Sequence, residues 1–189
     1  MNWKAGECMM DKVELRELSM DDGHEILEML KEIGPGENGF INDAYEVSAL
    51  EFKGYLAKKV DTSRGIDLEP QWVPQTTYWF YVDDQPIGYG KLRHYLNENL
   101  RKIGGHIGYC IRPTARGKGY GNVILKEMLK KAKEKNIPRA LLTCEETNDA
   151  SRGVIEHNGG MLERIEDAEC YYWIDLDIGT CIREIHIDS

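Results

Sequence analysis

The sequence lacks the features that mark membrane and secreted proteins. Its 189 residues contain no run of about 18 apolar residues, so neither a membrane-spanning helix nor a membrane partner is predicted. The first residues, "MNWKAGECMMDK", do not show the basic segment followed by an apolar segment that is typical of a signal peptide. We therefore expect a cytoplasmic protein.

Cysteine is scarce and scattered. The five cysteines form no C-x-x-C pair and no cluster with histidine, which argues against both a disulfide framework and a zinc site. We expect no bound metal. Three of the five lie in strand-like segments, where a reduced cysteine packs like a small apolar side chain.

Positive charge is also in short supply. The chain has 24 Lys and Arg residues against 33 Asp and Glu residues, a formal net charge of -9. Because nucleic-acid binding depends on neutralising phosphates, this balance argues against a nucleic-acid partner. It is compatible with a small cationic substrate. The length suits one domain with a sizeable core, and we expect a tail over residues 1–10 and a single domain over residues 11–189.

What the sequence does contain is a regular succession of strand-like and helix-like segments. Apolar residues alternate in the former and recur every three or four positions in the latter. The second half has the order strand, helix, strand, which predicts a mixed α/β layer. The expected ranges are strand 12–18, helix 19–30, helix 46–60, hairpin 76–95, strand 104–113, helix 122–136, strand 139–146, helix 148–160, and strands near 161–166, 170–177 and 181–187.

Residues 116–122, "RGKGYGN", place three glycines between a strand stopped by proline and a helix. The P-loop pattern fails because no Gly-Lys-Ser or Gly-Lys-Thr occurs, and G-x-G-x-G is not the Rossmann fingerprint. A plain surface turn is the simpler alternative. Glycines, however, let the backbone approach a ligand, and a helix start offers unpaired N–H groups and a positive dipole end. With Arg116 and Lys118 they predict an anion site suited to a pyrophosphate.

The pattern R-x-x-G-x-G, formed by Arg116, Gly119 and Gly121, resembles the acetyl-CoA-binding motif of the GNAT superfamily of N-acetyltransferases. The segment "GHIGYCIRPTARGKGYGNVILKEML" is similar to the fourth strand and third helix of that family. The segment "LLTCEETNDASRGVIEHNGGMLE" resembles its next strand, an asparagine at the strand exit, and the helix that follows. The resemblance implies an α/β fold with a mixed, mostly antiparallel sheet of about seven strands flanked by four helices.

The resemblance also implies how acetyl-CoA is held. Backbone N–H groups of the glycine-rich loop would bind the pyrophosphate, and the end of the preceding strand would pair with the pantetheine arm. The residues to which this role is carried over are Cys110, Ile111, Arg112, Arg116, Gly117, Lys118, Gly119, Tyr120, Gly121, Asn122, Asn148 and Ser151. For Ser151 the alternative is an ordinary residue in the first turn of a helix.

The reaction implied is direct attack of an amine on the thioester, without a covalent enzyme intermediate. A base must deprotonate the ammonium, or its neutral fraction must bind. His106, near the usual position of a family glutamate, is one candidate base, with a packed strand histidine as the alternative. Glu145 is a rival carboxylate, with a solvated strand end as the alternative. Where many members carry a tyrosine as general acid, this chain has Ile155, so that role is left open between Tyr109, Tyr120 and an unprotonated thiolate.

The acceptor is not specified by the sequence. Arg93, His94 and Asn97 lie where a strand leaves the sheet, and we expect them to bind substrate or to form an exposed strand end. The function predicted is acetyl transfer from acetyl-CoA to a primary amine of a small molecule or peptide. A non-catalytic acyl-CoA-binding sensor is the alternative. Many members of the family dimerise, and the C-terminal strands are the expected contact between two copies.

Overall fold

The computed structural model describes residues 12–176 of the chain. Its helices are α1 (His24–Ile33), α2 (Phe52–Arg64), α3 (Glu98–Lys102), α4 (Tyr120–Glu134) and α5 (Asp149–His157). Its strands are β1 (Val13–Glu17), β2 (Gly36–Glu37), β3 (Phe40–Ile41), β4 (Gln75–Val82), β5 (Gln85–Arg93), β6 (Ile107–Ile111), β7 (Arg139–Glu145), β8 (Met161–Glu166) and β9 (Glu169–Asp175). The expected tail over 1–10 and the expected strand at 181–187 lie outside the described residues.

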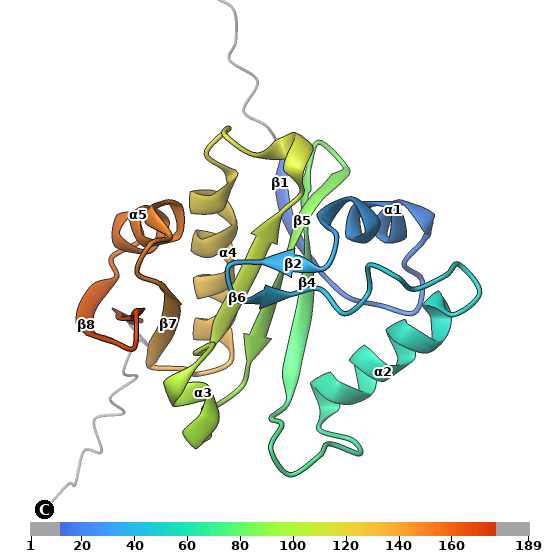
Figure 1. Cartoon of the computed structure of the whole chain (residues 1–189). Coiled ribbons are helices and arrows are strands. Elements are labelled where there is room, and N and C mark those ends of the chain that lie inside the picture. The colour runs from blue at the N-terminus through green and yellow to red at the C-terminus, as the bar shows by residue number, and fades with distance from the viewer. Residues whose placement is uncertain (1–11, 177–189) are drawn as a thin grey trace, which may run out of the picture.

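The seven longer strands form two antiparallel sheets, ordered β1-β4-β5-β6 and β7-β9-β8. Figure 1 shows α1 and α2 on one side of the first sheet, and α4 between that sheet and the second one, beside α5. The predicted mixed α/β fold is confirmed. The hairpin formed by β2 and β3 and the short helix α3 were not predicted, because elements of two to five residues are too short to show a hydrophobic period.

The hairpin of β4 and β5 lies at the centre of the first sheet. Asp83 and Asp84 both have positive φ, 48° and 59°, as a two-residue type I′ turn requires. Alternate side chains of β4 enter two separate cores. The core beneath α4 receives Tyr78, Phe80 and Val82, and the core beneath α1 receives Trp79 and Tyr81.

Helix α1 begins at His24, later than the sequence suggested. The expected helix started at Ser19, but the Ser19 N–H donates to Asp22 Oδ2 at 2.8 Å. Trp79 Nε1 donates to the same carboxylate oxygen at 2.6 Å. The side chain of Asp22 therefore holds the segment after β1 as a turn on the sheet, and the helix starts only after that turn.

Helix α2 also begins late, at Phe52 instead of Glu46. The backbone N–H and the hydroxyl of Ser48 donate to Glu51 Oε2 at 3.1 and 2.6 Å, which closes a separate turn ahead of the helix. Only Phe52 and Leu56 of α2 are buried. The remaining faces of the helix are available to line a cavity or to meet solvent.

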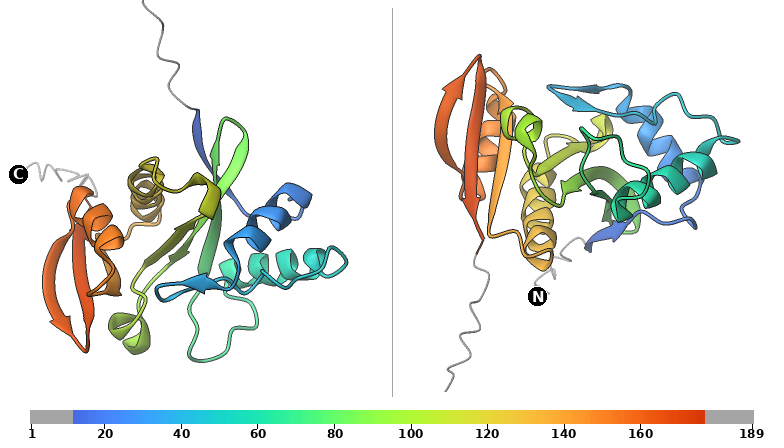
Figure 2. Two further views of the ribbon diagram at one scale, coloured as in Figure 1. Left: turned by 45° about the horizontal axis from the view of Figure 1, so that its top comes forward. Right: turned by 90° about the horizontal axis from the view of Figure 1, so that it is seen from below.

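The two sheets are joined at one residue, His106, just before β6. Its backbone N–H donates to the Leu141 carbonyl of β7 at 2.7 Å, and its Nδ1 accepts the Leu141 N–H at 2.9 Å. The imidazole thus takes up the Leu141 N–H, and no backbone pairing between β6 and β7 follows it in the described residues. In the described part of the chain β6 and β7 then belong to separate sheets, and Figure 2 shows them diverging.

Gly105 makes this junction possible. Its φ is 56°, and a Cβ atom at this position would lie 2.3 Å from the Leu141 carbonyl oxygen. A side chain here would combine the strain of a left-handed backbone with a clash against backbone. Only glycine therefore brings residue 106 close enough to bond Leu141 twice.

We predict that Gly105→Ala lowers the free energy of unfolding by about 2–4 kcal/mol, the sum of left-handed strain and overpacking. Denaturant unfolding measures this change. Gly153→Ala is the matched control, because a Cβ at this position of α5 meets nothing within 4 Å. The control should be neutral or stabilising by up to about 1 kcal/mol, as expected for Ala in a helix. Equal stability of Gly105→Ala and the parent protein would contradict the close approach described here.

Candidate functional site

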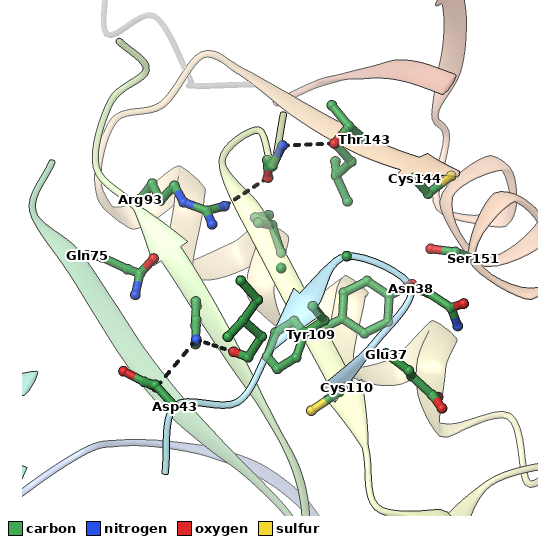
Figure 3. Close-up of a pocket in the computed structure, with 18 of the residues that line it drawn as sticks. Glu37, Asn38, Asp43, Gln75, Arg93, Tyr109, Cys110, Thr143, Cys144 and Ser151 are labelled. Carbon is green, nitrogen blue, oxygen red and sulfur yellow. Dashed lines mark hydrogen bonds and ion pairs between the residues drawn. The ribbon is translucent and has the colours of Figure 1, made fainter. Parts of the chain in front are cut away.

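A cavity of about 1170 Å³ occupies the gap between the diverging strands and continues beneath α2. We divide it into two parts. The loop half is lined by residues from the segment 107–122 and by the facing parts of β7 and α5. The α2 half is lined by residues from the segments 37–75 and 100–104, together with Lys91 and Arg93. Figure 3 shows Arg93, Gln75 and Asp43 along one wall, Cys144 and Ser151 along the other, and Tyr109 between them.

The glycine-rich stretch forms the outer end of the loop half. Gly117 and Gly119 have φ of 76° and 80°, and a Cβ at either position would meet nothing within 4 Å. Gly119 stands at the N-terminal cap position of α4, where no side chain caps the helix. The start of α4, with its positive dipole end, therefore lies beside open space, the arrangement that binds phosphate at helix starts.

Gly121, in the same stretch, allows two helices to pack closely. A Cβ at this position would lie 3.2 Å from Val154 Cγ2. The absence of a side chain here lets the first turn of α4 approach α5 closely. The start of α5 consequently forms the opposite rim of the loop half, where Asn148 caps the helix by accepting the Ser151 N–H at 3.0 Å.

The edge of β6 that faces the gap carries unused backbone groups. Arg112 N–H donates to Ile87 of β5, so alternation directs the backbone groups of Ile111 and Tyr109 away from β5. The Ile111 carbonyl indeed accepts from Arg116 Nε at 3.0 Å on that side. The Ile111 and Tyr109 N–H groups and the Tyr109 carbonyl can therefore pair with an extended ligand lying in the gap.

Tyr109 also directs its hydroxyl into the gap. The hydroxyl is buried, lies beside Ser151, and makes no hydrogen bond of normal geometry to any residue between 12 and 176. Burial raises the pKa of Tyr109 well above its usual range, so the phenol stays protonated. A protonated hydroxyl at this wall of the cavity can donate a hydrogen bond to a ligand.

The α2 half is built around the carboxylate of Asp43. Lys59 Nζ bonds this carboxylate, and Lys91 Nζ lies 3.8 Å from it while donating to the Ile41 carbonyl at 2.7 Å. Both lysine side chains are largely buried. Burial lowers the pKa of Lys91 to about 8, and Asp43 limits that shift. This cluster of charges was not predicted from the sequence, because its three members are far apart along the chain.

Residues 42–160 match the sequence model of the acetyltransferase (GNAT) family. The chain belongs to this family. It is a GNAT-type N-acetyltransferase, and the predicted family membership is confirmed. A search of curated protein sequences finds no match.

Solved structures of acetyltransferases share the fold at low identity. RimL, a ribosomal alpha-N-protein acetyltransferase in complex with coenzyme A, is 16% identical with a TM-score of 0.65, over 88% of this chain and 95% of that one. PseH, an N-acetyltransferase from Campylobacter jejuni in complex with acetyl coenzyme A, is 12% identical with a TM-score of 0.57, over 87% and 99%. A GNAT-family acetyltransferase from Streptococcus pneumoniae is 16% identical with a TM-score of 0.58, over 86% and 97%.

Most of the residues expected to hold the donor of this acetyltransferase line the cavity. The two that do not are Arg112 and Lys118. The Arg112 guanidinium bonds Glu32 of α1 instead, and Glu32 also accepts from the Thr114 hydroxyl at 2.6 Å. Arg116 reaches the tip of the β2–β3 hairpin, where its Nη1 lies 2.8 Å from Glu37 Oε1.

The structure argues against His106 as the base of the acetyltransferase. The side chain is buried, does not line the cavity, and uses Nδ1 to accept the Leu141 N–H. Burial, with smaller effects of Arg101 and Arg93, lowers the pKa of His106 to about 4. The imidazole is therefore neutral with its proton on Nε2, and it has no lone pair to offer a substrate.

Glu145 does not reach the cavity either. It is exposed at the end of β7, where its carbonyl accepts the Asn148 N–H at 2.9 Å. Its neighbour on β9, Glu169, lines the cavity in its place. The sequence located the end of the strand correctly but could not tell which of two paired strands directs its carboxylate inward.

The two cysteines of the cavity wall are not nucleophiles. Burial raises the pKa of Cys110 to about 12 and that of Cys144 to about 11. Both thiols therefore remain protonated at neutral pH. In this form they pack like small apolar side chains. This agrees with a reaction that forms no covalent enzyme intermediate.

Of the residues expected at the acceptor side, only Arg93 lines the cavity. His94 Nε2 lies 2.8 Å from the Thr76 hydroxyl, outside the cavity wall. Asn97 caps α3 by accepting the Leu100 N–H at 2.9 Å. These two side chains have local structural partners, whereas Arg93 faces the space in which a substrate would lie.

Residues 12–176 contain neither a candidate metal cluster nor a candidate membrane span. No group of three or more His, Cys, Asp or Glu side chains is placed to hold a metal ion. No helix in that range has the length and apolar character needed to cross a membrane.

We predict that Glu32→Gln lowers the free energy of unfolding by about 1–3 kcal/mol at pH 7, the value of hydrogen bonds to a charged group. Bonds from Arg112 and Thr114 lower the pKa of Glu32 to about 2, so its stabilisation is complete above pH 4.5 and is lost as the pH falls toward 2. Denaturant unfolding at pH 7 and near pH 2 measures the difference. It should be small for the exposed Glu28→Gln at both values, and a Glu32→Gln effect that persists near pH 2 would contradict the assignment.

Proposed function

We propose that the protein transfers the acetyl group of acetyl-CoA to a primary amine by direct attack of the amine on the thioester. The observation that carries the proposal is that two binding features lie in the same cavity. The uncapped start of α4 suits a pyrophosphate, and the unpaired edge of β6 suits an extended arm leading inward from it. The cavity continues to the charged α2 half, where an amine can approach.

The residues present fit coenzyme A as the donor. Open space beside Gly117 and Gly119 leaves room for phosphate oxygens against the backbone N–H groups. The gap-facing N–H groups of Tyr109 and Ile111 then serve the amide groups of the pantetheine arm. Asn148 and Ser151, on the facing rim, lie on the other side of the arm.

The chain supplies hydrogen bonds to the charge that develops during transfer. Backbone N–H groups on the β6 edge can donate to the oxyanion of the tetrahedral intermediate. The Tyr109 hydroxyl can donate to the leaving sulfur. Because the pKa of Tyr109 is raised above that of an ordinary thiol, this residue stabilises the thiolate through a hydrogen bond and keeps its proton. Ile155, at the usual tyrosine position, is fully buried and contributes only packing.

Neither predicted base lines the cavity, so we propose that the amine reacts from its neutral fraction. The fraction of substrate that has a free lone pair for attack then depends on the pKa of the substrate amine. The proton released in the attack passes to solvent through the open mouth of the α2 half. A homodimer and a cytoplasmic location complete the proposal, and the edge strand β8, with Met161 and Ile165 exposed, is the surface through which we expect two copies to meet.

We predict that Gly119→Val weakens coenzyme A binding at least tenfold, because the side chain fills the space beside the first N–H groups of α4. Isothermal titration calorimetry with coenzyme A measures it. Gly159→Val is the matched control, since its φ of 86° and open surroundings cause the same backbone strain outside the cavity. Both variants should lose about 1–2 kcal/mol of stability. Unchanged affinity in Gly119→Val would remove the pyrophosphate assignment.

We predict that kcat/KM rises with pH along a limb that follows the pKa of the acceptor amine. Two acceptors of different amine pKa, assayed by release of free coenzyme A thiol, should give limbs displaced by the difference in their pKa values. One limb at the same pH for both would instead reveal a titrating base on the enzyme. Binding of acetyl-CoA without thiol release for any amine would favour the sensor that the sequence left as an alternative.

A further inference from the structure

Arg93 is a half-buried cation that no carboxylate between residues 12 and 176 neutralises. Its guanidinium lines the α2 half, and no carboxylate between residues 12 and 176 lies within 4.0 Å of it. Its pKa is lowered by burial, with no neighbouring acid to offset that effect. Burying a charge without a counter-ion is costly, so its retention on a cavity wall points to an anion that arrives from outside.

The guanidinium is held in place by backbone alone. Arg93 Nη1 donates to the carbonyls of Gly104 and Gly105 at 2.8 and 3.1 Å, just before β6. A guanidinium has five N–H donors arranged as a fork, and these two bonds come from a single nitrogen. Nε and Nη2 are left for a ligand, and a carboxylate is the group that such a fork binds in a bidentate manner.

The nearest acid of the α2 half cannot serve this purpose. Asp43 is shared between Lys59 and Lys91, which leaves the buried part of this half with more positive than negative charge. The other acids of its wall, Glu37, Asp61, Asp67 and Glu69, are exposed and outnumber the exposed Lys58. Arg93 can therefore pair with an incoming anion while the exposed acids favour a cation, which suits a ligand that carries both charges.

We propose that Arg93 binds a carboxylate of the acceptor, so that the substrate is an amine that also carries a carboxylate. This inference rests on the proposed transfer to an amine and names the class of that amine. Figure 3 shows the Arg93 side chain directed into the cavity on the side away from Ser151.

The position of Arg93 also bears on the shape of the acceptor. Arg93 stands opposite His106, three residues before Tyr109, and its side chain bonds residues still further from Tyr109. Three residues of strand correspond to about 10 Å. With the thioester expected beside Tyr109, the amine and the carboxylate of the acceptor are therefore several bonds apart, as in a side-chain amine of an amino acid.

Matched pairs of acceptors test the inference. In the thiol-release assay we expect kcat/KM for 6-aminohexanoate to exceed that for hexylamine at least tenfold, and kcat/KM for lysine to exceed that for cadaverine similarly. Arg93→Gln should bring both ratios close to one, and Arg93→Lys should retain part of the preference through charge alone. Arg101→Gln is the control, since it removes an exposed arginine of α3 that does not line the cavity, and it should keep the parent ratios.

A binding measurement separates this inference from the proposed function. With coenzyme A at saturation, calorimetry should detect hexanoate binding to the parent protein and to Arg101→Gln, and at least a tenfold loss in Arg93→Gln. Turnover of hexylamine as fast as 6-aminohexanoate, or a preference that survives in a folded Arg93→Gln, would overturn the carboxylate site and leave amine acetylation intact. Hexanoate binding without acetylation of any amine would support the site and overturn the proposed function. Absence of hexanoate binding to the parent protein would overturn the site.

Discussion

The pair of hydrogen bonds between His106 and Leu141 is the constraint on which the rest of the site depends. One bond joins the two backbones, and the other ties the Leu141 N–H to the imidazole ring. Beyond this junction β6 and β7 belong to separate sheets in the described residues. Both strands therefore leave the junction with an unpaired edge, and the space between those edges becomes the inner part of the cavity. Gly105 permits the approach, so the split follows from a single backbone conformation and a single ring.

The two halves of the cavity are made in different ways. In the loop half the groups offered to a ligand are backbone N–H groups, held by the helix start at Gly119 and by the pairing of β6 with β5. In the α2 half they are charged side chains: Asp43 is shared between Lys59 and Lys91, and Arg93 has no carboxylate within 4.0 Å among residues 12–176. The first half requires a shape and a dipole, whereas the second requires particular residues.

This difference decides what the sequence could predict. "RGKGYGN" is local, so its position between a strand and a helix could be recognised, and the long periodic segments around it were predicted with it. For His106 the sequence left a base and a packed strand histidine as alternatives, because its partner lies 35 residues away and only the fold brings them together. Asp43 and Lys91 are likewise distant in sequence, and α2 began later than predicted because Ser48 and Glu51 close a turn that periodicity does not register.

Because the loop half offers backbone groups to a ligand, it can tolerate many substitutions during evolution. Every residue type has an N–H group, so substitutions on this surface leave the donor groups unchanged provided that the few required glycines remain. Such a surface can persist while almost every other position diverges. The α2 half has no such protection, since one replacement at Arg93 or Asp43 alters its charge. A lineage built on this plan can therefore exchange one substrate for another without rebuilding the half that binds the common donor.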